Sequence, residues 1–131
     1  MSHMVKVEDF QITSLSALKR ACARLGYEFR AGQKTARYWN GKQAQVDHAI
    51  AIPGTTWEIG VAEEQVNGRK TYSLQADFYG TEGKKMEQAV RQLRQYYAVE
   101  LAKETARRKG YSVREQKLPN GSIKLVVGVG R

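Results

Sequence analysis

One stretch constrains the fold of this chain more than any other, an apolar stripe within residues 86–101. Its members recur every three or four residues, which places them on one face of an α-helix. They are Met86, Val90, Leu93, Tyr97 and Leu101. The stripe predicts one long helix from Lys84 to about Lys109. It is followed by Gly110, and glycine readily adopts the left-handed conformation that ends a helix.

Strand patterns occupy much of the remaining chain. Alternation of apolar and polar residues predicts strands within residues 4–12, 46–52, 57–61 and 72–78, where two of them form a hairpin around Asn67-Gly68. A second hairpin follows the long helix and turns at Asn120-Gly121.

A shorter helix is predicted between the first of these strands and the rest. Thr13 or Ser14 is a suitable N-cap, and Gly26 follows the expected last residue, Leu25. The elements therefore run β-α-β-β-β-α-β-β, with about six strands. Short turns favour antiparallel pairing. We expect an α+β fold over residues 1–131, a single domain with one mostly antiparallel sheet and both helices packed on one face.

The net charge is concentrated in the last third of the chain. Residues 84–131 contain 12 Lys and Arg but 4 Glu, so they hold +8 of the total +9. Such an asymmetry indicates a surface for a negatively charged partner, either nucleic acid or an acidic protein surface. The alternative is a helix face that the cations simply keep solvated. The candidate contacts are Arg91, Arg94, Arg107, Arg108, Lys109 and Arg114.

A second candidate patch lies at Arg37, Tyr38 and Trp39. It belongs to residues 29–46, which contain four basic residues and no acidic one. Cations interleaved with aromatic rings are typical of single-stranded nucleic-acid sites, where bases stack on the rings. The favoured alternative is a plain β-hairpin turning at Asn40-Gly41, with its rings packed inward.

The C-terminal region also resembles a known family. The residues concerned are Lys109, Gly110, Tyr111 and Val113, then Gly121, Ser122, Ile123, Lys124, Leu125 and Val126. The pattern is similar to that of hypothetical chloroplast reading frame 35, also called domain of unknown function 1257, which occurs in algal chloroplast genomes and in bacteria. Members tend to accompany ferredoxin-like and AAA-type ATPase proteins. The resemblance therefore implies an accessory role in a multiprotein, ATPase-associated system.

Catalytic chemistry finds little support in the sequence. The HExxH, CxxC, GxGxxG and P-loop patterns are missing from all 131 residues. His48 is the one credible general base, and its position on an apolar strand face favours a structural role. Cys22 lies in the apolar stripe of the first helix and is expected to be a buried hydrophobe. Glu58 and Asp77 could meet across a hairpin, but exposure to solvent or ion pairs with a nearby Lys or Arg are favoured.

We therefore expect a non-enzymatic binding module with a basic surface for an anionic partner, nucleic acid being one such partner. The alternative is an accessory or adaptor protein. No cofactor or metal is expected. With one cysteine, no signal-peptide pattern and no long apolar run, a cytoplasmic protein without membrane contact is predicted. The sequence indicates no oligomeric state.

Overall fold

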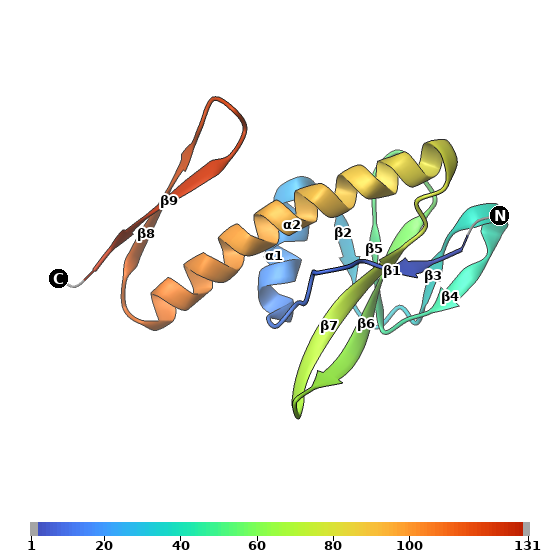
Figure 1. The fold of residues 1–131 in the computed structure, drawn as a ribbon, viewed down its shortest axis with the longest axis horizontal. Coiled ribbons are helices and arrows are strands. Elements are labelled where there is room, and N and C mark those ends of the chain that lie inside the picture. Colours follow the sequence, from blue (N-terminus) through green and yellow to red (C-terminus); the bar gives the residue numbers. More distant parts are fainter. Residues whose placement is uncertain (1–2, 130–131) are drawn as a thin grey trace.

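The fold is taken from a computed structural model that describes residues 3–129. In chain order its elements are β1 (Val5–Lys6), α1 (Leu15–Leu25), β2 (Glu28–Arg30), β3 (Thr35–Arg37), the 3₁₀ turn η1 (Trp39–Gly41), β4 (Gln43–Gln45), β5 (His48–Ala51), β6 (Glu58–Val66), β7 (Arg69–Ala76), α2 (Gly80–Arg108), β8 (Ser112–Lys117) and β9 (Ile123–Gly128). Figure 1 shows that α2 runs along much of the length of the molecule.

The main sheet has five strands in the order β1-β7-β6-β5-β2, and every neighbouring pair is antiparallel. This confirms the α+β fold class. The strands are distributed differently from the single six-stranded sheet that the sequence predicts. β3–β4 and β8–β9 form two separate two-stranded sheets. The predicted element order lacks three short strands, β2, β3 and β4.

The separation of β8–β9 follows from the length of α2. Its 29 residues span about 44 Å. The longest strand of the sheet, β6, has nine residues and spans about 30 Å. The C-terminal third of α2 therefore extends beyond the sheet and delivers the last hairpin there (Figure 1). We call residues 98–128, which comprise this end of α2 and the β8–β9 hairpin, the distal arm.

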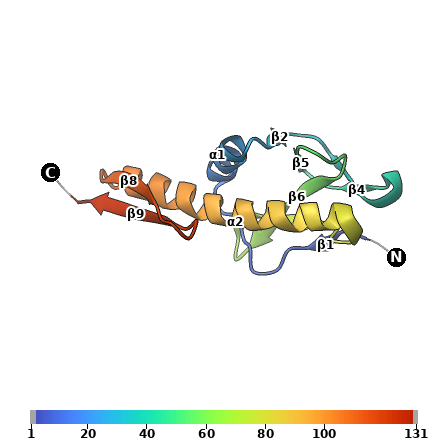
Figure 2. The ribbon, with the colours of Figure 1, turned by 90° about the horizontal axis from the view of Figure 1, so that it is seen from above.

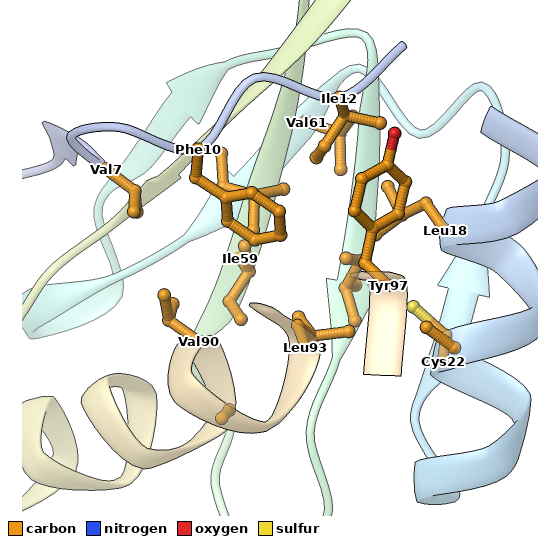
Figure 3. Packing of buried hydrophobic residues seen from close by; sticks show 14 of the residues in the cluster. Val7, Phe10, Ile12, Leu18, Cys22, Ile59, Val61, Val90, Leu93 and Tyr97 are labelled. Atoms are coloured by element: carbon orange, nitrogen blue, oxygen red, sulfur yellow. The ribbon is translucent and has the colours of Figure 1, made fainter. Parts of the chain in front are cut away.

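Both helices pack on one face of the main sheet, as predicted. From α2, Met86, Leu93 and Tyr97 reach the same buried cluster as Leu18 and Cys22 of α1. Figure 3 shows Leu93, Tyr97, Leu18 and Cys22 gathered with side chains of the sheet and the N-terminal segment. The sheet and segment residues of the cluster include Ile12, Ile50, Ile59, Val61 and Leu74, all with no exposed surface. The apolar stripe of α2 thus lies in the core up to Tyr97, and Leu101 is partly exposed.

The ends of α1 match the sequence signals. The Ser14 hydroxyl accepts a hydrogen bond from the Ala17 N–H at 3.1 Å, which satisfies one of the free donors at the helix start. Gly26 ends the helix with φ 76°, a left-handed conformation that glycine adopts without steric cost. The capping serine also ties α1 to α2, because its hydroxyl donates to the Glu104 carboxylate at 3.0 Å.

The other face of the main sheet is covered in part by the β3–β4 hairpin. Ala36 and Val46 pack on Ala49, and Met4 lies against them. Gly60 of β6 permits this close approach, because a methyl group at that position would lie 2.5 Å from a Val46 methyl carbon. The hairpin that carries the second predicted patch therefore has a structural role as a cover.

Candidate binding surfaces

The residues predicted to contact an anionic partner fall into two groups that lie apart in the molecule. Arg37, Tyr38 and Trp39 belong to the β3–η1–β4 hairpin, which lies at the same end of the molecule as the start of α2 (Figure 1). The other six lie along α2 and on β8, and four of them, Arg107, Arg108, Lys109 and Arg114, belong to the distal arm. The structure does not bring the two groups together into one surface.

The β3–η1–β4 patch presents little free surface for stacking. Trp39 and Tyr38 are half-buried, and the Lys42 ammonium lies 5.5 Å from the centre of the Trp39 ring. Arg37 is exposed and makes a long 3.4 Å hydrogen bond to the Thr56 carbonyl. This arrangement is that of the plain hairpin, in which the ring already has a cation over it.

Arg94 is engaged within the molecule. Its guanidinium donates to the carbonyls of Asp9 at 2.7 Å and Glu8 at 2.9 Å, and it lies 4.9 Å from the centre of the Phe10 ring. Two hydrogen bonds and a cation–π contact hold the N-terminal segment on α2. Arg91 is more available, since its one ionic contact is a 3.9 Å approach to Glu87 on the helix surface.

A cluster of ion pairs fixes the distal arm to α1. At its centre the side chain of Glu100 is only 4% exposed, and it accepts hydrogen bonds from Arg20 at 3.1 Å and Arg24 at 2.9 Å. Arg24 also binds Glu115 of β8, with nitrogen–oxygen distances of 2.8 and 2.9 Å. Lys103 completes the cluster at 2.7 Å from Glu115. The cations of α1 thus neutralise the acids of the arm.

This cluster determines which cations of the distal arm remain available to a partner. Glu100, Glu104 and Glu115 are all paired, and Arg108 is held at 3.0 Å by Glu104. The remaining cations of the arm are exposed, and no acid among the described residues lies within ion-pair distance of them. They are Arg107, Lys109, Arg114, Lys117 and Lys124. Three of these belong to the predicted contact set, while Lys117 and Lys124 extend it.

The cluster also lowers the pKa values of its carboxyl groups. Hydrogen bonds from Arg24 and then from Lys103 bring the pKa of Glu115 from its ordinary value of 4.5 down to about 2. For Glu100, burial by itself raises the pKa, but the hydrogen bonds from Arg24 and Arg20 more than offset it, so its pKa also lies below the ordinary value.

Acid should therefore weaken this cluster. A carboxyl group whose pKa is lower in the folded state stabilises that state above its unfolded pKa, and the stabilisation is lost as protons bind. We expect the melting temperature, followed by circular dichroism, to fall progressively from about pH 4.5 towards pH 2. The Glu115→Gln variant should start lower and show a shallower decline. An equally steep decline in that variant would show that Glu115 does not contribute.

The structure reveals one surface that the sequence interpretation missed, an open hollow of about 460 Å³ on the distal arm. Its floor is α2, at Ala98, Leu101, Ala102 and Thr105, and its wall includes Val127 of β9. Lys109 and Tyr111 lie at its end. The surface of the hollow is almost entirely apolar. The sequence signal was the spacing of small residues at Ala98, Ala102 and Thr105, four and then three apart, beside Leu101, the last member of the predicted stripe.

The residues considered for catalysis are engaged within the fold. His48 accepts a hydrogen bond at Nδ1 from the Gly32 N–H at 2.9 Å, and its ring lies beside Phe29 and Tyr72. Burial, with a contribution from Lys34, lowers its pKa, which favours the neutral form of the ring. Cys22 is buried, and burial raises the pKa of its thiol to about 12, which disfavours the reactive thiolate.

The two carboxylates that could have formed a pair are separately engaged. Glu58 is buried and accepts hydrogen bonds from Arg30 at 2.9 Å and from the Arg37 N–H at 2.8 Å. Asp77 accepts one from the Tyr79 N–H at 3.0 Å. Within residues 3–129, no group of three or more His, Cys, Asp or Glu side chains is placed to hold a metal ion.

The described chain is thus an α+β protein with two helices over an antiparallel sheet and a projecting helix–hairpin arm. The profile of the family described as "Protein of unknown function (DUF1257)" matches residues 21–126, and the chain belongs to that family. It is 30% identical over 129 residues to the "Uncharacterized protein ycf35" of Cyanophora paradoxa, covering 97% of this chain and 96% of the relative. No solved structure matches. The resemblance found in the sequence is confirmed.

Neither helix is suited to spanning a bilayer. Over the described part of the chain, no helix combines sufficient length with sufficient apolar character to do so.

Proposed function

We propose that this protein is a non-enzymatic binding module whose distal arm presents a basic surface to an anionic partner. The observation that supports this is the set of five exposed arm cations without an acidic neighbour among the described residues, next to a cluster that neutralises all three acids of the arm. Cations that are not needed inside the molecule remain available to a partner, and electrostatic complementarity favours an acidic one.

Nucleic acid is one partner that such a surface suits. Arg107, Lys109 and Arg114 would contact phosphates, and Arg91 would extend the surface along α2. From Arg91 to Lys109 the helix advances by about 27 Å. Arg94, Arg108 and the patch of Arg37, Tyr38 and Trp39 contribute less in this proposal, because their side chains are already engaged or half-buried.

The second candidate is an accessory or adaptor protein, and the apolar hollow favours it. Phosphate recognition requires cations and does not need an apolar hollow, whereas protein interfaces combine an apolar centre with a polar rim. In this proposal the cations select an acidic protein surface and the hollow supplies contact area. A cytoplasmic location remains part of the proposal.

Charge reversal on the arm tests the proposed function. The combined variant Arg107→Glu, Lys109→Glu, Arg114→Glu should weaken binding to labelled single- and double-stranded DNA, RNA or polyglutamate by about tenfold or more at low salt. For a nucleic acid, the slope of log K against log salt should also become shallower, by about 0.7–0.9 for each phosphate that the variant no longer neutralises. Fluorescence anisotropy over a salt series measures both quantities.

A matched variant controls for net charge. The combination Lys34→Glu, Arg69→Glu, Lys84→Glu makes the same change at exposed positions away from the arm and should leave binding at the arm nearly unchanged. The proposal is wrong if the wild-type protein binds none of the four probes at low salt. It is also wrong if the two variants lose affinity equally.

A further inference from the structure

The hairpin of the distal arm has two chemically different strands. β8 is Ser-Val-Arg-Glu-Gln-Lys, with three charged residues, and Glu115 joins it to Arg24 of α1. β9 is Ile-Lys-Leu-Val-Val-Gly and has one charge, at Lys124. β9 pairs only with β8 within the described chain, so its other edge has unpaired N–H and C=O groups. Natural edges of this kind are usually protected by charges, proline or a bulge, and this one is poorly protected.

The apolar hollow adjoins β9 at Val127, near the C-terminal end of that strand. β8 is tied to α1, and in Figure 2 β9 lies on the side of the hairpin away from α1. The hollow is lined by Val127 of β9 and by no residue of β8. Val127 is 44% exposed, a large value for a valine that faces a helix. The free strand and the hollow therefore meet at Val127.

The dimensions of the hollow suit an extended chain. From Ala98 to Lys109 the floor of α2 is about 16 Å long. An extended chain of five residues covers the same distance at about 3.3 Å per residue. Strands in a sheet lie about 4.8 Å apart, so a strand paired with β9 would lie above the small side chains of Ala98, Ala102 and Thr105. These side chains leave the space that a third strand requires.

We infer that the distal arm binds an extended segment of an acidic partner protein, which adds to β9 as a third strand and fills the hollow. The segment has small or β-branched apolar residues on the side facing α2. On its other side it has acidic residues, which pair with Lys124 on β9 and Arg114 on β8. Addition of a strand to an exposed edge is an established mode of peptide recognition, in which main-chain hydrogen bonds give affinity and side chains give specificity. The inference rests on the proposed function and names its partner class.

Charge decides between this occupant and a second copy of the chain. Pairing β9 with β9 of another copy would bring together two arms, each with Lys109, Lys124 and Arg114 exposed and without an acidic neighbour in the described residues. Like charges placed across an interface oppose association, whereas an acidic strand is attracted by the same cations. The arm therefore favours a different, acidic chain.

A capped heptapeptide of alternating glutamate and valine is the probe. Titrated into the ¹⁵N-labelled full-length protein, it should shift the amide signals of Ile123–Gly128 and of the α2 residues that line the hollow. Ala102→Trp should weaken binding by about tenfold or more, because the indole occupies the space of the added strand. Ala102 is exposed, so the variant should remain folded, as the unchanged remainder of the spectrum would show. Ala23→Trp, at an exposed alanine of α1, is the matched control and should bind like the wild type.

Several outcomes would overturn the inference. One is peptide binding that Ala102→Trp leaves unchanged. Another is tighter binding of an acidic helical peptide, of an oligonucleotide, or of the same heptapeptide with lysine in place of glutamate. A third is a dimer in sedimentation analysis that Ala102→Trp dissociates, because the occupant would then be a second copy. If the heptapeptide does not bind while other anionic probes still bind the arm, the inference is wrong and the proposed function is retained. If no anionic probe binds, both fall.

Discussion

Replacing Glu100 by alanine is expected to lower the free energy of unfolding by about 3 kcal/mol. The carboxylate is buried and joins Arg20 and Arg24 of α1 to α2, with Lys103 at 3.7 Å. Removing it leaves three cations close together without their central anion. Breaking a buried ion pair costs about 3–5 kcal/mol, and the half-exposed arginines place this case at the lower end because water can reach them.

Urea unfolding followed by circular dichroism and tryptophan fluorescence measures this loss. Glu87→Ala is the matched control, because Glu87 lies on the same helix with an exposed side chain and a long contact to Arg91. Its change should remain within about 0.5 kcal/mol. The Glu100 variant should also reduce the protection of β8 and β9 amides against hydrogen exchange, since the cluster fixes the arm. A loss of less than about 1 kcal/mol, far below the usual cost of breaking a buried pair, would show that the cluster contributes little to the position of the arm.

Much of this fold follows from local sequence patterns. The stripe from Met86 to Tyr97, the cap at Ser14 and the stop at Gly26 are short-range signals, and each appears in the structure as predicted. The position of the last hairpin, by contrast, does not follow from local sequence patterns. Its own alternation predicts strands but does not say which sheet they join. That depends on how far α2 extends past the sheet and on the ion pairs of Arg24, a residue 91 positions from Glu115.

The candidate surface could be predicted only in part. The sequence located the basic excess in the last third of the chain, and the structure places Arg107, Lys109 and Arg114 on an exposed arm. The sequence could not show that Arg94 would bind backbone carbonyl groups, since these belong to a distant segment, at Glu8 and Asp9. The hollow was hidden for a related reason. Small residues on a helix indicate a hollow only when the position of the neighbouring strand is known, and the sequence does not give that position.

Gly83→Ala is the second large effect that we expect, and here helix propensity and packing predict opposite signs. In the interior of a helix alanine is more favourable than glycine by about 1 kcal/mol. Gly83 lies in the first turn of α2, so helix propensity alone predicts a gain. The structure predicts a loss, because the added methyl group would overlap the backbone carbonyl group of Phe78. Backbone atoms cannot move aside as the end of a flexible side chain can.

The expected loss is about 3 kcal/mol, the upper end of the range for overpacking. Urea unfolding measures it, and Lys84→Ala, at the neighbouring exposed position, should change stability by no more than about 0.5 kcal/mol. A higher free energy of unfolding in the Gly83 variant would mean that the backbone of the chain reversal between β7 and α2 can shift to accommodate the methyl group. That reversal matters beyond its own turn. It sets the direction in which α2 leaves the sheet, and over a helix about 44 Å long a small change of angle at Gly83 would displace the distal arm and the surface that we propose it presents.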